Sequence, residues 1–232
     1  MTVRSWSTLA AAGAVGWAAP ALAPSLPLLC DALGVHRRVA GDGAPVHLTF
    51  DDGPHPGGTP AVLAALAARR ATATFFLVGE QVERFPALAR EIVAEGHVVA
   101  LHGYRHRSQL RRSPRALADD LRRATDVIGS TTGALAPLYR PPYGIFSAAG
   151  VALVRHRGDA AWLWTRWGRD WRADATPRSV ARLAAGELVP GEVILLHDAD
   201  HYGDPGCWRA TAGALPLILT AIEDGGHQTA TL

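Results

Sequence analysis

Residues 46–54, VHLTFDDGP, join a short apolar run to two adjacent carboxylates and a Gly-Pro pair. Val46 to Phe50 has the length and composition of a buried strand, which the following glycine- and proline-rich stretch ends. Residues 59–70 form the next predicted helix, with Thr59 as its N-cap and Pro60 in its first turn. The regular part of the chain therefore opens with a strand and a helix, and two acidic side chains lie where that strand ends.

The same alternation continues to the end of the chain. Further strands are predicted at 72–78, 97–101, 136–139, 160–164, 192–196 and 227–231, and helices at 85–95, 113–128, 147–156, 177–186 and 210–222. Strands that alternate with helices imply a parallel sheet. About seven such units fit a closed or nearly closed barrel better than an open sheet. The predicted fold is therefore α/β, a distorted (β/α) barrel of about seven parallel strands.

The composition is that of an ordinary globular protein, with 48% hydrophobic and 19% charged residues and a net charge of +2. The most basic stretch, residues 105–115, holds five arginines. We interpret it as a solvated loop and helix start, because phosphate binding needs a broad basic face, and we expect no nucleic-acid partner. Cys30 and Cys207 fit no zinc-ribbon or redox spacing. Outside the cell they could pair, whereas a cleaved leader would remove Cys30.

Residues 1–44 differ from the rest of the chain. After Arg4, residues 5–30 carry no charge and are mostly Ala, Leu, Val, Trp and Pro, which resembles an export signal or a membrane anchor. Residues 19–21, Ala-Pro-Ala, offer a cleavage site, and the alternative is a helix packed on the domain. We predict an apolar leader or membrane anchor with a linker at 1–44, a folded domain at 45–232, and an exported or membrane-anchored, extracytoplasmic protein.

Side chains with catalytic chemistry follow the predicted strands. They are Asp51, Asp52, His102, His106, Arg140, Asp170 and His197. In parallel α/β folds the carboxyl edge of the sheet is where sites are built. Adjacent carboxylates such as Asp51 and Asp52 repel unless a divalent cation or an arginine compensates them.

The two histidines at positions 102 and 106 suggest a metal site. On a helical turn the i, i+4 spacing aims both imidazoles at one point. One carboxylate with two histidines and an open position for water is a common catalytic zinc shell. Each signal is weak alone, since most HxxxH pairs are not ligands and most Asp-Gly-Pro stretches are turns.

Five segments, in order, resemble the motifs of the polysaccharide deacetylases, the NodB-homology group or carbohydrate esterase family four. They are 49–54 (TFDDGP), 102–106 (HGYRH), 140–144 (RPPYG), 170–171 (DW) and 195–198 (LLHD). The resemblance covers about residues 45–232 and implies a NodB-type barrel. It implies hydrolysis of acetamide groups on N-acetylglucosamine polymers, such as peptidoglycan or chitin oligomers, or of acetyl esters on xylan. We expect a monomer whose partner is the polysaccharide.

The resemblance also implies a metal site with a general base beside it. Asp52, His102 and His106 would hold a divalent metal, usually zinc and sometimes cobalt. Asp51 would be the general base that takes a proton from the metal-bound water. Arg140 would pair with Asp51 and keep it oriented and ionised.

The remaining matched residues would protonate the leaving group and shape the pocket. His197 would be the general acid, with Asp170 holding its imidazole and raising its pKa. Tyr143 would offer its backbone N–H to the developing oxyanion and contact the substrate. Trp171 and Leu195 would wall the pocket around the acetyl methyl group.

Two positions depart from the family's pattern. Gly103 stands where the second motif usually has Ser or Thr, whose hydroxyl steadies the ligand loop. We therefore expect either lower metal affinity or a loop that is held in another way. Trp167 stands where the fourth motif usually has an acid. Because Asp170 and Trp171 are retained, we expect activity to survive and the substrate groove to be reshaped.

Six aromatic residues form a further group. They are Trp162, Trp164, Trp167, Trp171, Tyr202 and Trp208. Aromatic faces stack on sugar rings, so the group could be a glycan platform. Core packing is the alternative, and it is favoured for Trp162 and Trp164.

Two other functions stay open from the sequence. A protein of the same fold could cleave a small non-peptide amide, although such relatives typically alter the first motif or the metal ligands. A non-catalytic glycan-binding module would be expected to lack Asp51 or His197. Both residues are present, so the sequence favours the metal-dependent deacetylase.

Overall fold

A computed structural model of the chain describes residues 16–232, and eight strands lie in this part. They are β1 (Val35–His36), β2 (His47–Asp51), β3 (Thr74–Leu77), β4 (Val98–Leu101), β5 (Leu138–Tyr139), β6 (Ala160–Trp162), β7 (Arg166–Trp167) and β8 (Val193–His197). The α-helices are α2 (Pro27–Ala32), α3 (Gly58–Ala67), α4 (Gly79–Arg84), α5 (Pro86–Ala94), α6 (Pro114–Thr132), α7 (Ala148–Arg157), α8 (Pro177–Ala185) and α9 (Trp208–Asp224). Short 3₁₀ helices are η1 (Ala19–Ser25), η2 (Gln109–Arg111) and η3 (Pro142–Gly144).

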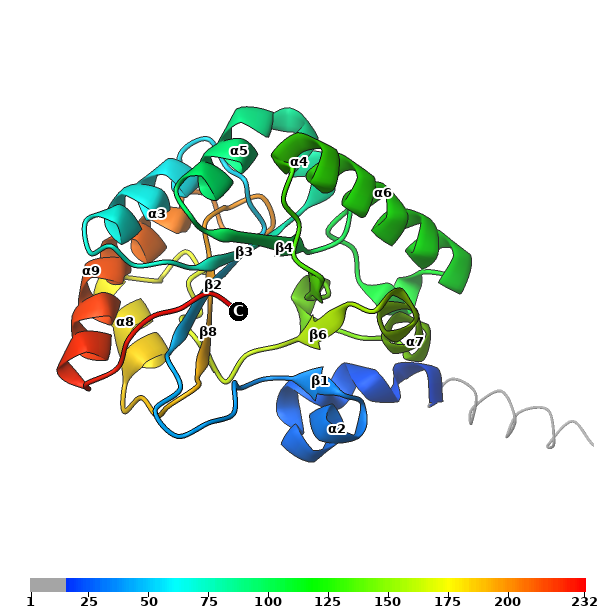
Figure 1. The fold of residues 1–232 in the computed structure, drawn as a ribbon, viewed down its shortest axis with the longest axis horizontal. Helices are drawn as coiled ribbons and strands as arrows, with labels where there is room; N and C mark the ends of the chain where they lie inside the picture. Colours follow the sequence, from blue (N-terminus) through cyan, green and yellow to red (C-terminus); the bar gives the residue numbers. More distant parts are fainter. Residues whose placement is uncertain (1–15) are drawn as a thin grey trace, which may run out of the picture.

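All strand pairs of the sheet are parallel, in the order β1-β6-β5-β4-β3-β2-β8-β7. The sheet curls into a half-barrel with the helices around its outside (Figure 1). The predicted distorted (β/α) barrel is therefore confirmed, with eight strands instead of about seven. Every crossover returns the chain to the same end of the sheet, so the residues that follow the strands gather at one edge.

The centre of the sheet is apolar because both of its faces are covered. Every residue of β2 and of β3 is buried, as expected for parallel strands between the barrel interior and the outer helices. Phe50 and Phe75, on adjacent strands, stack with ring centroids 5.0 Å apart. Ser113 caps α6 by accepting the N–H of Ala116 at 3.2 Å, so that this helix begins where the sequence predicts.

One predicted strand is wrong, and one helix was not predicted. Residues 227–231 form no strand ladder, because only Thr229 makes an isolated bridge, with Val46. The carboxyl-terminal tail instead crosses the amino ends of the central strands, where the Leu232 N–H donates to Thr74 Oγ1 at 2.9 Å. The helix predicted at 85–95 is present as α5, and a separate helix, α4, precedes it. Phe85 divides α4 from α5, because a residue before proline is disfavoured in the helical region.

The described part of the predicted leader and linker is folded against the barrel. β1 pairs with β6 through Val35 and Ala161, so residues before position 45 belong to the sheet. Ala23 and Cys30 are buried in the core. Residues 1–15, on which much of the leader prediction rests, lie outside the described part. Within residues 16–232 no helix has both the length and the apolar character needed to cross a membrane. Both Cys30 and Cys207 are free and buried.

Candidate active site

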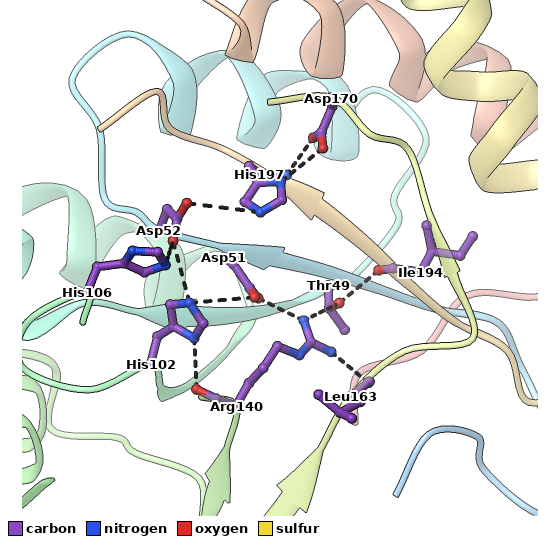
Figure 2. A network of polar contacts seen from close by, with 10 residues as sticks. All are labelled: Thr49, Asp51, Asp52, His102, His106, Arg140, Leu163, Asp170, Ile194 and His197. Atoms are coloured by element: carbon purple, nitrogen blue, oxygen red, sulfur yellow. Dashed lines mark hydrogen bonds and ion pairs between the residues drawn. The ribbon is translucent and has the colours of Figure 1, made fainter. Parts of the chain in front are cut away.

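Three side chains converge where β2 and β4 end. Asp52 Oδ1 lies 3.4 Å from His102 Nε2 and 3.3 Å from His106 Nε2 (Figure 2). The predicted helical turn around the two histidines is wrong. Residues 102–106 are an irregular loop in which Gly103 has a φ of +88°. The loop nevertheless aims both imidazoles at the Asp52 carboxylate.

The protonation of these groups suits a divalent metal. His102 Nδ1 donates to the Arg140 carbonyl at 2.8 Å, which leaves Nε2 as the ring nitrogen that faces Asp52. Burial lowers the pKa of His106 to about 4, which keeps its imidazole neutral. Asp52 Oδ1 is buried without a hydrogen-bond partner among the described residues. One oxygen and two nitrogens with free lone pairs, all within 4.8 Å of one another, fit the donor set of zinc.

Asp51 is held by a fully buried arginine. Arg140, 0% exposed, donates from one Nη atom to Asp51 Oδ1 at 2.7 Å and to Thr49 Oγ1 at 2.8 Å. Its other Nη atom donates to the Leu163 carbonyl at 3.1 Å. Asp51 Oδ2 lies 3.7 Å from His102 Nε2. One carboxylate oxygen is thus anchored, and the other faces the His102 and Asp52 group.

His197 and Asp170 form a second charged pair on the other side of the pocket. His197 Nδ1 donates to Asp170 Oδ1 at 2.9 Å, and Asp170 Oδ2 accepts the His197 N–H and the Thr211 hydroxyl, each at 2.7 Å. Burial alone would lower the pKa of His197, but the Asp170 carboxylate outweighs it and raises the pKa to about 10. The free ring nitrogen, Nε2, lies 4.0 Å from Asp52 Oδ2.

Tyr143 has an unusual backbone conformation. Its φ of +61° is left-handed, which is strained for a tyrosine and is common at functional sites. The hydrogen bonds of the described residues include none from the Tyr143 N–H. The ring is 56% exposed and lies edge-on to His106 at 4.3 Å. An available backbone donor therefore sits beside the predicted metal ligands.

These groups open into one cavity of about 310 Å³. Of the predicted site residues, the cavity is lined by Asp51, Asp52, His102, His106, Tyr143, Trp171, Leu195 and His197. Arg140 and Asp170 are buried behind it, each in contact with a residue of the wall. The structure therefore brings together all ten of the predicted residues, while the role of each stays a prediction.

The aromatic group divides between the cavity and the remainder of the fold. Trp164 and Trp167 stack at 5.9 Å and line the cavity with Trp171. Tyr202 also lines it and stacks flat on His106, with centroids 4.2 Å apart and an interplanar angle of 14°. Trp162 packs against His36 instead.

Sequence reasoning did not link Tyr202 to the metal ligands, because 96 positions separate it from His106. The Tyr202 hydroxyl donates to Glu80 Oε1 at 2.9 Å and accepts from Gln81 Nε2 at 3.0 Å. These bonds fix the ring, and with it the position of the imidazole beneath it. The one sequence feature that could have linked Tyr202 to the site is its position soon after the fifth motif.

The ligand loop is held in a different way from the family's usual hydroxyl. Asp120, on α6, accepts the Tyr104 N–H at 2.8 Å and the Arg105 N–H at 3.3 Å. Arg112 donates to the same carboxylate at 2.6 Å. A Cβ at Gly103 would lie 3.1 Å from Asp120 Oδ2. The glycine therefore leaves room for the carboxylate that holds the loop.

A second histidine cluster lies near the first and fifth motifs. His55 Nδ1 accepts the N–H groups of Gly57 and Gly58 at 3.1 and 2.8 Å. Its Nε2 must then carry the proton, which it donates to Asp200 Oδ1 at 3.0 Å. His201 Nε2 donates to the Pro54 carbonyl at 3.2 Å. The hydrogen-bonded state of His55 offers no lone pair to a metal, and the cluster anchors the loop after β2.

Residues 38–159 match the sequence profile of the polysaccharide deacetylases. The chain belongs to the polysaccharide deacetylase family. It is 37% identical to a chitooligosaccharide deacetylase of Bradyrhizobium sp. (strain ANU 289) over 190 residues, which is 79% of this chain and 86% of the relative. The predicted family and the predicted enzyme class, a hydrolase, are confirmed.

Solved structures agree with this assignment. A peptidoglycan N-acetylglucosamine deacetylase superposes with a TM-score of 0.81 at 26% identity, over 87% of this chain and 92% of that one. A family 4 carbohydrate esterase from Streptomyces lividans, solved with acetate, gives a TM-score of 0.72 at 28% identity, over 82% and 93% of the two chains. This polysaccharide deacetylase thus shares the fold over nearly all of its described length.

Proposed function

We propose that this protein hydrolyses the N-acetyl groups of N-acetylglucosamine residues in a polysaccharide and that it requires a divalent metal of the zinc type to do so. The observation that carries the proposal is the convergence of Asp52, His102 and His106 in one cavity. The Asp51–Arg140 and His197–Asp170 pairs flank that group. The names of the relatives, chitooligosaccharide deacetylase and peptidoglycan N-acetylglucosamine deacetylase, support the substrate class.

Asp51 is positioned to act as the general base. Asp52, His102 and His106 would hold the metal, which supplies Lewis-acid chemistry that strengthens water as a nucleophile and polarises a carbonyl. Asp51 Oδ2 takes the proton of the attacking water. Arg140 holds the carboxylate through Oδ1, and Thr49 in turn accepts a hydrogen bond from the same guanidinium nitrogen. Arg140 is fully buried, so its guanidinium is a fixed partner for the Asp51 carboxylate.

The residues on the other side of the cavity stabilise the oxyanion and protonate the leaving group. The Tyr143 N–H donates to the carbonyl oxygen as negative charge develops on it, and one such donor is worth roughly 3–4 kcal/mol. His197 Nε2 gives its proton to the departing nitrogen as the C–N bond breaks. Acetate and a free amine are the products. Asp170 keeps the imidazole protonated and holds the ring through Nδ1.

The walls of the cavity fit an acetyl group attached to a sugar. Leu195 and Trp171 provide apolar surface beside His197, and the Trp171 ring meets the His197 ring edge-on at 5.6 Å. Trp167 is 39% exposed and extends this surface outward. A methyl group is therefore received at the closed end of the cavity, and a sugar ring lies along the aromatic rim.

Acetate release by the full-length protein tests the proposal. Substrates are N-acetylglucosamine oligomers, peptidoglycan and acetylated xylan, each with chelator and then with added zinc or cobalt. Acetate that is lost with chelator and restored by metal is the expected result, and the restoring metal identifies the cofactor. An Asp51→Asn variant measures the background. No acetate from any substrate, from protein that binds one metal per chain, would support a small-amide hydrolase or a binding module instead.

We also propose that the protein acts outside the cytoplasm, at a membrane surface. The uncharged stretch 5–30 supports this, as do three exposed leucines, one on η1, one between η1 and α2 and one on α2. Leu22, Leu26 and Leu28 are 57%, 47% and 83% exposed. Flotation with lipid vesicles tests the idea. The triple change of these leucines to Glu should abolish co-flotation, and equal flotation of both proteins would refute it.

A further inference from the structure

A second hollow adjoins the active-site cavity. It has a volume of about 670 Å³, and it shares His106 and Tyr143 with the cavity. Its remaining wall includes Arg107, Arg111 and Arg112. We call this hollow, defined by these five residues, the arginine groove. Because Tyr143 and His106 separate the two spaces, a polymer bound with one sugar at the metal ligands would extend its neighbouring unit into the arginine groove.

Two of the three arginines of the arginine groove have no charged partner among residues 16–232. Residues 105–115 hold five arginines and no acidic residue. Arg112 is committed to Asp120 at 2.6 Å and to the Ala116 carbonyl at 2.9 Å. Arg107 and Arg111 are exposed, and their side chains make no hydrogen bond or ion pair with residues 16–232. Two guanidinium groups are therefore available to a ligand.

Some arginines elsewhere on the surface are paired with acidic side chains. Arg69 meets Glu223 at 2.8 Å, and Arg172 meets Asp174 at 2.7 Å. Since the whole chain carries a net charge of only +2, two unpaired arginines beside one cavity are a local concentration of positive charge. Guanidinium groups bind carboxylate and phosphate oxygens through paired hydrogen bonds, and they do so in preference to neutral hydroxyls.

We propose that the arginine groove binds an anionic group, a carboxylate or a phosphate, on the polymer unit next to the sugar that is deacetylated. The inference rests on the proposed function and narrows its substrate to an anionic glycan, such as a peptide-bearing cell-wall polymer, over a neutral chitin-type chain. The exposed Tyr143 ring forms the wall between the two spaces. Arg107 and Arg111 are specificity residues in this proposal and take no part in the bond cleavage.

Variants of the two free arginines test the proposal. Arg107→Gln, Arg111→Gln and the double variant are compared with Arg115→Gln, which removes the same charge from the same run outside the arginine groove. Four substrates are used: a neutral N-acetylglucosamine oligomer, a peptidoglycan fragment with free peptide carboxylates, the same fragment with those carboxylates amidated, and a phosphate-bearing glycan.

The double variant should raise KM about 10-fold for an anionic substrate and leave kcat within about 2-fold. KM for the neutral oligomer and for the amidated fragment should not change. Added salt should weaken the wild-type preference, because exposed charges are screened. A KM effect confined to the carboxylate fragment or to the phosphate glycan identifies which anion is bound.

Three results would overturn the proposal. The first is equal KM changes for neutral and anionic substrates, and the second is an Arg115→Gln effect as large as that of the double variant. The third is a wild-type KM that is no lower for the free fragment than for the amidated one and also no lower for the phosphate glycan than for the neutral oligomer. Each of these requires acetate release by the wild-type protein. A complete absence of acetate from all substrates would instead refute the proposed function, so the two failures are distinguishable.

Discussion

Replacement of Asp170 by Asn should move the alkaline limit of activity. The carboxylate raises the pKa of His197 from its ordinary value of 6.5 to about 10. At 1.36 kcal/mol for each pH unit, that difference corresponds to roughly 5 kcal/mol in favour of the imidazolium. The general acid is protonated below its pKa, and activity is lost as pH rises through it. In Asp170→Asn the pH at which activity is lost should therefore be lower by about three units, because the amide keeps the geometry of the carboxylate and removes its charge.

The assay is kcat against pH, from pH 6 to 11, with metal-loaded protein and an N-acetylated oligomer. At pH 8.5 a group with a pKa near 6.5 is only about 1% protonated, so kcat of the variant should be about 100-fold lower there than at its own optimum. Thr211→Val is the matched control, since it removes a 2.7 Å hydrogen bond to Asp170 but leaves the carboxylate charged. Its alkaline limb should shift by less than about one pH unit. A folded Asp170→Asn protein with the wild-type limb would refute the assignment of His197 as the acid.

Three further predictions concern the general base, a metal ligand and the packing of α3. Asp51→Asn should lower kcat by about 10²–10⁴-fold with unchanged metal content by elemental analysis, and loss of metal would mean that the two aspartates are misassigned. His102→Ala should lower the bound metal and the affinity for it in a competitive chelator titration, whereas normal stoichiometry would remove it from the ligand set. Gly58→Ala should lower the melting temperature or prevent folding, because the new Cβ would collide with the Asp198 carbonyl. The control Gly129→Ala, in open space on a helix, should instead raise the free energy of unfolding by about 0.5–1 kcal/mol. Equal melting temperatures of the two variants would contradict this account.

The parts of the fold that sequence could predict are those in which one short segment carries its own signal. β2, β3, β4 and β8 are continuous apolar runs buried on both faces, and each was predicted to within two residues at either end. β1 and β7 have two residues each, one of them polar in both cases, so neither stands out as an apolar run. The carboxyl-terminal segment has the composition of a strand, but its partners are mostly side chains and loop atoms.

The site was predictable in composition and only partly in geometry. Placing Asp52 and His102 after parallel strands is enough to bring them to one edge. The i, i+4 spacing of His102 and His106 could not distinguish a helical turn from a loop, because both can direct the two rings to one point. The contacts of Asp120 and Tyr202 with the ligand loop and with His106 are tertiary, so no local pattern could reveal them.

The order of the strands has a consequence for synthesis. β2 lies between β3 and β8, yet β8 is the last strand of the chain to be made. The three metal-ligand candidates leave the ribosome before residue 107, whereas His197 follows about ninety residues later. Until then one edge of β2, beside Asp51, has no partner for its backbone groups. A chain interrupted before Val193 would thus carry an ion site on an open, aggregation-prone edge, and only the completed chain can close that edge and gain the acid that releases the product.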